Sequence, residues 1–322
     1  MLAVLATTFP FFALVLCGWL AAQRGLQPDS AIPGLNGFVL FFALPCLLFR
    51  FGRDTPLLVL LSPVLLGVYL AAALLIVFFT VATTLSARVG MKDAAFGALV
   101  AAFPNSGFMG VPLIVALLGP AAAGPVVSTL LADLFVTSSL CIALAQAGTS
   151  GVAGRAAFLQ ALKAAGANPL PWAIAIGAAV GASGLALPAP LGKAIAMLGD
   201  AASPVALFSI GAVLSRSGRA NRRAGRITPP ALYLPVAAVK LLLHPALVFA
   251  LGAAVRWLGA PLSGAQLVAL TLVAALPSAS NVALLAERHG ADNGRVARII
   301  LASTALAFLT FSALAALLIE AG

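Results

Sequence analysis

Long apolar runs separated by short polar loops follow one another along the whole chain. Ten of these runs approach the roughly 20 residues that a helix needs to cross the hydrocarbon core of a bilayer. Numbered as spans one to ten, they cover residues 3–22, 32–51, 56–86, 94–118, 121–147, 168–187, 190–215, 229–256, 264–287 and 296–319. The third run is long enough to be tilted or to extend past the membrane. The pattern predicts an all-α polytopic membrane protein with ten transmembrane helices.

The amino-acid composition excludes a soluble protein. Of the 322 residues, 62% are hydrophobic and 8% are charged, whereas about a quarter of a soluble domain is charged. Cys17, Cys46 and Cys141 lie inside apolar runs without metal-ligand spacing, and we interpret them as small buried residues. The sequence contains no nucleotide-binding loop and no Ser/His/Asp arrangement. We therefore expect neither an enzyme nor a cofactor or metal site.

Two apolar runs are interrupted near their middle by proline. Pro104 follows Ala-Ala-Phe in span four, and Pro277 follows Ala-Ala-Leu in span nine. A proline inside a membrane helix removes a backbone hydrogen bond, and the freed polar groups are tolerated only where protein or a watery cavity satisfies them. Breaks at corresponding places in two halves of a chain indicate a transporter binding site.

Prolines recur in the same order in the two halves of the chain. Pro10 is matched by Pro171, Pro45 by Pro204 and Pro104 by Pro277, at separations of 161, 159 and 173 residues. The order predicts a duplicated five-span unit, and because five is odd the second copy enters the membrane the other way up. We expect a 5+5 inverted repeat in which residues 1–147 and 168–322 are the repeats and 148–167 is a short cytoplasmic linker.

The distribution of basic residues predicts the orientation. If the N-terminus lies outside, 13 Lys and Arg residues fall in cytoplasmic loops and 4 on the opposite side, with Lys240 inside a span. The 13 are Arg24, Arg88, Lys92, Arg155, Lys163, Arg216, Arg219, Arg222, Arg223, Arg226, Arg288, Arg295 and Arg298, and the 4 are Arg50, Arg53, Lys193 and Arg256. By the positive-inside rule both termini lie outside. We interpret the net charge of +10 as a topology signal that also meets anionic lipid, not as a nucleic-acid surface.

The residues after each proline are the candidate substrate site. If spans four and nine cross, the ends of four half-helices meet, and the N-terminal ends can hold an anion without a full charge in lipid. Neutral donors and acceptors stand directly beyond each break. The predicted substrate-binding residues are Pro104, Asn105, Ser106, Pro277, Ser278, Ser280 and Asn281.

Three further titratable residues lie deep within spans, namely Asp133, Lys240 and His244. An isolated charge at the bilayer centre costs about 2.5–3.5 kcal/mol on insertion scales, so each needs a partner or water. Asp133 and Lys240 are the natural pair, and Lys240 and His244 share one helix face. The pair either takes up and releases a coupling proton or is a permanent ion pair that joins two helices. His244 is also explained as a neutral hydrogen-bonded residue.

Four stretches resemble the auxin efflux carrier family. They are Pro104–Leu113; Leu35–Val39 with Ala43–Pro45; Asp200–Ala201 with Phe208–Gly211; and Leu276–Pro277 with Arg288–Asp292. The resemblance implies ten spans, with a scaffold of spans 1, 2, 6 and 7 and a crossover domain of spans 3–5 and 8–10. It also implies elevator-type alternating access for organic anions, with Pro104, Asn105 and Pro277 bordering the substrate carboxylate, and a possible homodimer.

The chain departs from the plant carriers in its loop between spans five and six, which has only about 20 residues. The departure puts auxin itself in doubt, and bacterial family members are linked to small carboxylates such as malate or malonate. The same general fold occurs in bile-acid sodium symporters and sodium/proton antiporters. By that more distant likeness, Asp133 with Lys240 is similar to an acid–lysine pair used for proton exchange.

We therefore expect an integral plasma-membrane protein, in a bacterium the inner membrane, that is a secondary transporter of small organic anions such as dicarboxylates or auxin-like acids. The coupling ion is expected to be H⁺, with Na⁺ left open. The alternatives are a sodium-coupled symporter of the bile-acid type, a membrane sensor that binds an anion without moving it, and a channel. A channel is disfavoured because paired breaks suit an occluded site better than free conduction.

Overall fold

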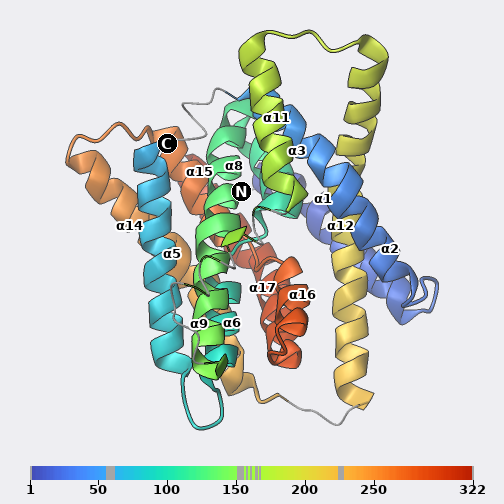
Figure 1. Cartoon of the computed structure of the whole chain (residues 1–322), viewed down its shortest axis with the longest axis vertical. Helices are drawn as coiled ribbons and strands as arrows, with labels where there is room; N and C mark the ends of the chain where they lie inside the picture. The colour runs from blue at the N-terminus through green and yellow to red at the C-terminus, as the bar shows by residue number, and fades with distance from the viewer. Residues whose placement is uncertain are drawn as a thin grey trace.

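The computed structural model describes residues 2–55, 62–150, 156, 159, 162–163, 166, 168–223 and 228–320. Throughout this part of the chain the regular structure is helical (Figure 1). Most of the expected linker, 148–167, lies outside the described residues, as do residues 56–61 at the start of span three. The all-α prediction is confirmed.

The first half of the chain forms nearly continuous helices with short π-helical turns. Its elements are α1 (Leu2–Gln23), α2 (Ala31–Phe38), η1 (Val39–Ala43), α3 (Leu44–Asp54), α5 (Pro63–Thr84), α6 (Met91–Ala102), η2 (Ser106–Gly110), α7 (Val111–Leu118), η3 (Pro120–Ala122), α8 (Ala123–Ala132), η4 (Asp133–Thr137) and α9 (Ser138–Ser150).

The described part of the second half is also helical, with one π-helical turn, η6. Its elements are α11 (Pro169–Ser183), α12 (Ala189–Arg223), η5 (Pro230–Leu232), α13 (Leu234–Ala238), η6 (Val239–Leu243), α14 (His244–Trp257), α15 (Gly264–Ala275), α16 (Asn281–Arg288) and α17 (Asn293–Glu320). Helix α12 continues past the predicted end of span seven because arginine is a good helix former, so the helix outlasts its apolar run.

Seven helical stretches among the described residues are long and apolar enough to cross a membrane. They are Leu2–Gln23, Ala31–Asp54, Pro63–Thr84, Pro120–Ala147, Ala189–Arg216, Leu234–Trp257 and Asn293–Glu320. Shorter apolar helices, Ser106–Leu118, Pro169–Ser183 and Gly264–Ala275, lie in the three remaining predicted runs. The chain is thus an integral membrane protein by length and composition of its helices.

Prolines explain where three of the π-helical turns lie. Segments η1, η2 and η6 each end two residues before a proline, namely Pro45, Pro112 and Pro245. A proline ring clashes with the carbonyl four residues earlier and offers no N–H, and a wider turn with one extra residue relieves that clash. Pro10 and Pro204, two of the six prolines paired between the halves, lie inside the continuous helices α1 and α12.

Helices α1, α3, α11 and α12 pack against one another through glycine. A methyl group added at Gly18 would overlap the carbonyl oxygen of Phe208, and one at Gly211 would overlap that of Val15. Gly177 of α11 approaches the carbonyl of Phe49 in α3 in the same way. Small residues let membrane helices approach backbone to backbone, which maximises dispersion contacts.

The remaining helices form a second layer of packing. Helix α5 contacts α6 and α14, α6 contacts α9, and α15 contacts α14 and α17. Figure 1 shows α1, α2, α3 and α12 along one side, α5 and α14 along the other, and α6, α8, α9 and α15–α17 between them. Phe12 of α1 meets Phe308 of α17 edge-on, with ring centroids 5.3 Å apart.

We predict that Gly211→Ala lowers the free energy of unfolding by about 1–3 kcal/mol, the usual cost of overpacking, because the new methyl group would force α12 away from α1. The matched control is Gly192→Ala on the same helix, where an added Cβ meets nothing within 4 Å. Thermal unfolding of the purified protein in detergent measures both. Equal stability of the two variants would contradict the glycine-dependent contact.

Candidate functional site

The two proline breaks pair with each other. The N–H of Asn105 donates to the carbonyl of Pro277 at 2.8 Å, and the N–H of Ala279 donates to the carbonyl of Phe103 at 3.0 Å. The two segments run antiparallel, bridged at Pro104 and Ser278. The backbone groups that each break frees are therefore used by the other break, as the absence of water in a bilayer core requires.

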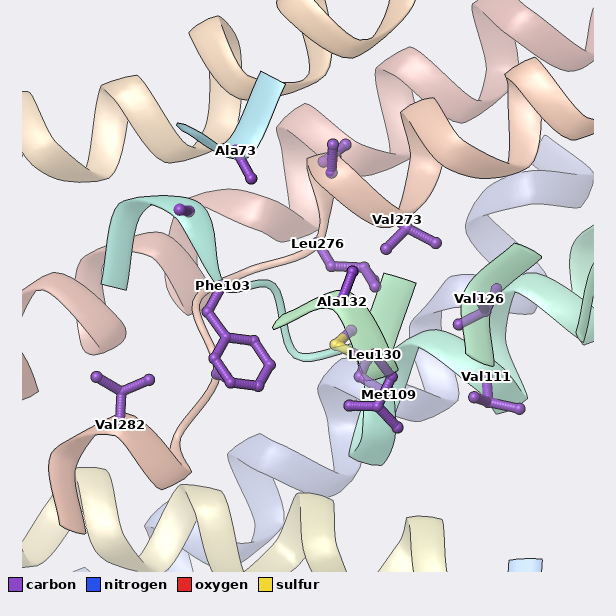
Figure 2. Packing of buried hydrophobic residues seen from close by; sticks show 14 of the residues in the cluster. Ala73, Phe103, Met109, Val111, Val126, Leu130, Ala132, Val273, Leu276 and Val282 are labelled. Carbon is purple, nitrogen blue, oxygen red and sulfur yellow. The ribbon is translucent and has the colours of Figure 1, made fainter. Parts of the chain in front are cut away.

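Apolar side chains enclose this pairing. Phe103 and Leu276, the residues before the two prolines, are 2% and 0% exposed, and Figure 2 shows them on the neighbouring unwound stretches of the chain. A Cβ atom at Gly110 would lie 2.7 Å from the Leu276 side chain. The missing side chain of Gly110 therefore makes the room that Leu276 fills.

The second break is completed by side chains from two other helices. The proline at 277 offers no N–H, and the carbonyl of Val273 instead accepts from Leu276 at 3.1 Å. The carbonyl of Ala274 would normally take the N–H of Ser278, but that N–H donates to Ser303 Oγ at 3.2 Å. Lys240 Nζ takes its place and donates to the Ala274 carbonyl at 2.8 Å. A cation at the C-terminal end of α15 also complements the helix dipole.

Backbone donors remain available where the chain re-enters a helix. Within the described part of the structure, no hydrogen bond uses the N–H of Gly107 or Phe108 at the start of η2, nor that of Ser280 or Asn281 at the start of α16. These are the orphan donors that every helix N-terminus leaves. Two helix starts with free N–H groups close to one another provide partial positive charge for an anion.

The predicted substrate residues divide into two groups. Asn105 is 5% exposed and Ser106 Oγ is buried with no hydrogen-bond partner among the described residues. Ser280 and Asn281 are half-buried. Ser278, in contrast, accepts a hydrogen bond from Ser303 Oγ at 3.1 Å, and is 1% exposed. Ser278 therefore completes the break, while the other four keep polar groups available.

Two neighbouring cavities reach these residues. The smaller leaves about 30 Å³ for the centres of water molecules and is lined by Pro104, Asn105, Ser106 and Gly107. The larger leaves about 70 Å³ and is lined by Ser280 among others. One water needs about 10–15 Å³ by this measure. Leu40, Phe108 and Asn281 line both cavities, so the Asn281 side of the break faces both spaces.

Asp133 is completely buried in η4 and receives two hydroxyl donors. Tyr69 Oη donates to Asp133 Oδ2 at 2.6 Å, and Thr137 Oγ1 donates to Oδ1 at 2.9 Å. Each carboxylate oxygen therefore has a donor, which offsets part of the cost of burying the group. Among the eight acidic residues, all of them described, Asp133 alone is buried.

Lys240 and His244 form a second buried cluster. Lys240 Nζ lies 3.1 Å from His244 Nδ1, and both residues are 0% exposed. We expected Lys240 to form an ion pair with Asp133. Among the described residues, the ion pairs with a nitrogen–oxygen distance of at most 4 Å do not include this one. The lysine is held instead by the carbonyl left free at the break, and the aspartate by hydroxyl groups. The rings of Tyr69 and His244, 5.9 Å apart between centroids, join the two clusters.

Two participants were missed in the sequence. Tyr69 is one of only two tyrosines in the chain and lies inside an apolar run, so its hydroxyl needed a partner at that depth. This need for a hydrogen-bond partner was the feature of the sequence that could have identified Tyr69. Ser303 gives no such signal, because serine is common in membrane helices and bonds to its own helix, as Ser303 does to Ile300.

The chain is similar to known membrane transport proteins over nearly its whole length. Residues 3–314 match the family described as "Membrane transport protein". The chain is 30% identical over 332 aligned residues to a protein of Rhizobium meliloti (strain 1021) named "Putative malonate transporter". That alignment covers 98% of this chain and 95% of the relative, so it includes both breaks and the buried clusters.

We predict that Ser303→Ala lowers the free energy of unfolding by about 1–3 kcal/mol, since it leaves the buried N–H of Ser278 without an acceptor. Thr304→Val is the matched control, because the Thr304 hydroxyl bonds only to Ile300 of its own helix. Thermal unfolding in detergent compares them. A Ser303→Ala protein as stable as the control would show that the Ser278 amide does not depend on this serine.

Proposed function

Since the chain belongs to the membrane transport protein family, the family of the auxin efflux carriers that its motifs resembled, we propose that it is a secondary active transporter of small organic carboxylates. The observation that carries the proposal is the pair of joined breaks, with four free backbone N–H groups and the amides of Asn105 and Asn281 beside them. The name of the relative supports a dicarboxylate such as malonate as the substrate.

We propose that the anion binds in the space shared by the two cavities. Neutral N–H donors at helix starts can hold a carboxylate without placing a full opposite charge in the membrane. Asn105, Ser106, Ser280 and Asn281 would supply side-chain hydrogen bonds, while Pro104, Pro277 and Ser278 would shape the break. Such a site lowers the cost of desolvating the anion but releases it readily, which suits transport.

The proposed architecture is a 5+5 inverted repeat of ten spans with elevator-type alternating access. The close glycine contacts among α1, α3, α11 and α12 support a rigid scaffold of spans 1, 2, 6 and 7. The breaks belong to the other helices, and these would carry the substrate across as one body. In this arrangement both termini face outward and the basic loops are cytoplasmic, as the positive-inside rule favours.

We further propose that transport is coupled to protons through Asp133, with Lys240 and His244. Asp133 is the buried carboxylate, Tyr69 orients it, and Lys240 donates to Ala274 directly before the second break. A change of charge on this cluster would therefore be felt at the end of α15, which carries the substrate site. The sodium-coupled and sensor alternatives give different outcomes in the experiments below.

Uptake of labelled malonate into proteoliposomes tests the carrier proposal. Wild-type protein should give saturable uptake, and Asn105→Ala should reduce kcat/KM by roughly 10- to 100-fold, the effect of losing one hydrogen bond to a charged group. Thr83→Ala is the control, since this exposed hydroxyl bonds only to its own helix. Absence of saturable flux over a panel of carboxylates would favour the anion sensor.

Imposed ion gradients test the coupling. Asp133→Asn keeps the shape of the side chain, and its amide can accept from one of the two hydroxyl groups of Tyr69 and Thr137 and donate to the other. It cannot carry a proton, so it should abolish accumulation driven by a pH gradient while counterflow exchange of substrate continues. Wild-type accumulation in this variant would refute the role of Asp133. Flux that follows a sodium gradient and ignores pH would favour sodium coupling.

A further inference from the structure

Arg216 lies on the wall of the larger cavity. It belongs to α12, it is half-buried, and it lines the same space as Ser280 and Asn281 at the start of α16. An arginine and a helix N-terminus with free N–H groups thus border one cavity. Both favour negative charge, and they come from different helices.

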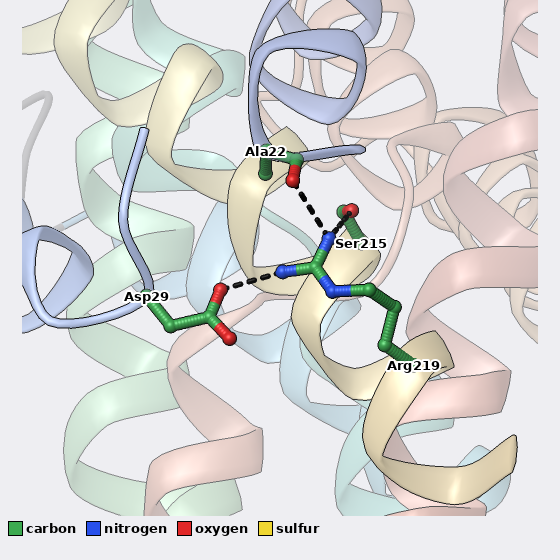
Figure 3. Close-up of polar contacts among 4 residues, drawn as sticks. All are labelled: Ala22, Asp29, Ser215 and Arg219. Atoms are coloured by element: carbon green, nitrogen blue, oxygen red, sulfur yellow. Dashed lines mark hydrogen bonds and ion pairs between the residues drawn. The ribbon is translucent and has the colours of Figure 1, made fainter. Parts of the chain in front are cut away.

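Arg216 differs from the next arginine of its own helix. Arg219 donates to Ala22 O at 2.9 Å, to Ser215 Oγ at 2.6 Å and to Asp29 Oδ1 at 2.6 Å (Figure 3). Arg216 makes no hydrogen bond or ion pair with any residue that the structure describes. The charge of Arg219 is therefore used within the protein, and that of Arg216 remains available to a ligand.

We propose that Arg216 is a specificity-determining residue that binds the second carboxylate of a dicarboxylate, while the first lies against the free N–H groups and amides of the break. This inference rests on the proposed function and adds the group that separates dicarboxylates from monocarboxylates. A guanidinium binds a carboxylate through two parallel hydrogen bonds, which gives it more selectivity than a point charge has. A monocarboxylate leaves this arginine without a partner.

The lining of the cavity also includes one acidic residue, and this residue provides a second test of the proposal. Glu287, an exposed residue of the last turn of α16, lines the same space. It would repel a dianion, so its effect on affinity should be opposite to that of Arg216. If Arg216 and Glu287 instead served each other as an ion pair, removal of either would have the same effect.

The size of the cavity fits a small solute. Its 70 Å³ for water centres is several times the space of one water, about 10–15 Å³, so the cavity has room for a solute larger than one water. Each displaced water must be replaced by an equivalent hydrogen bond, or affinity is lost. In the proposed complex, Arg216 and the break, which line the same cavity, supply these bonds to the two carboxylates of such a molecule.

The experiment compares malonate with malonamate, in which one carboxylate is a neutral amide, as competitors of labelled malonate uptake into proteoliposomes. Wild-type protein should prefer malonate by roughly 10- to 100-fold, the contribution of a hydrogen-bonded charge. Arg216→Gln should remove this preference by weakening malonate and leaving malonamate within about twofold. Glu287→Gln should strengthen malonate binding, and Arg219→Gln, which removes an equal charge, should leave the preference unchanged.

The outcomes separate this inference from the proposed function. Equal weakening of both competitors by Arg216→Gln, or an unchanged preference, overturns the role of Arg216 while transport itself stands. If Glu287→Gln weakens malonate binding as much as Arg216→Gln does, the role of Arg216 is also overturned, and the result favours an ion pair between Arg216 and Glu287. Should Arg216→Gln fail to fold, a wild-type protein that does not prefer malonate still refutes the inference. Wild-type protein without saturable uptake refutes the proposed function.

Discussion

The need to satisfy backbone groups inside the membrane governs the centre of this protein. Two prolines break two helices where no water is available, and an unsatisfied N–H or carbonyl costs several kcal/mol there. The hydrogen bonds from Asn105 to Pro277 and from Ala279 to Phe103 settle much of this cost by pairing one break with the other. Ser303 and Lys240 complete the second break. The donors that remain free are those at the two helix starts, and these are the groups an anion can use.

The surrounding helices hold this pairing in place by two different kinds of contact. On one side, glycine brings the backbones of α1 and α12, and of α3 and α11, into direct contact. Around the breaks, larger side chains such as Phe103 and Leu276 fill the space. Backbone contact through glycine is close and hard to deform, whereas the contacts around the breaks are made by side chains. This difference supports the proposed division into a scaffold and a part that moves against it.

The buried charges show how far residue type predicts a partner. Asp133 and Lys240 were expected to pair because an acid and a base at similar depth lower each other's cost. In the structure, Tyr69 and Thr137 donate to the aspartate, while the lysine donates to the Ala274 carbonyl beside His244. A helix break offers a carbonyl that an unbroken helix would not, so it competes with a carboxylate for the lysine. Depth along a span follows from sequence, but which hydroxyl or carbonyl is closest does not.

Three features could be predicted from the amino-acid sequence alone: the all-helical membrane fold, the helix breaks at Pro104 and Pro277, and the positions of Asn105 and Asn281 beside those breaks. These features follow from local chemistry, since apolar length sets the spans and proline removes a backbone donor wherever it occurs. The three-dimensional packing was needed to show that the two breaks bond to each other, that Ser278 is used by Ser303 and that Tyr69 supports Asp133. It was also needed to show that Arg216 lines a cavity while Arg219 is bonded to Asp29. The contacts between the two breaks join residues that are up to 176 positions apart in the chain, as Phe103 and Ala279 are. They depend on how helices are placed side by side, which is decided by packing among all of them at once.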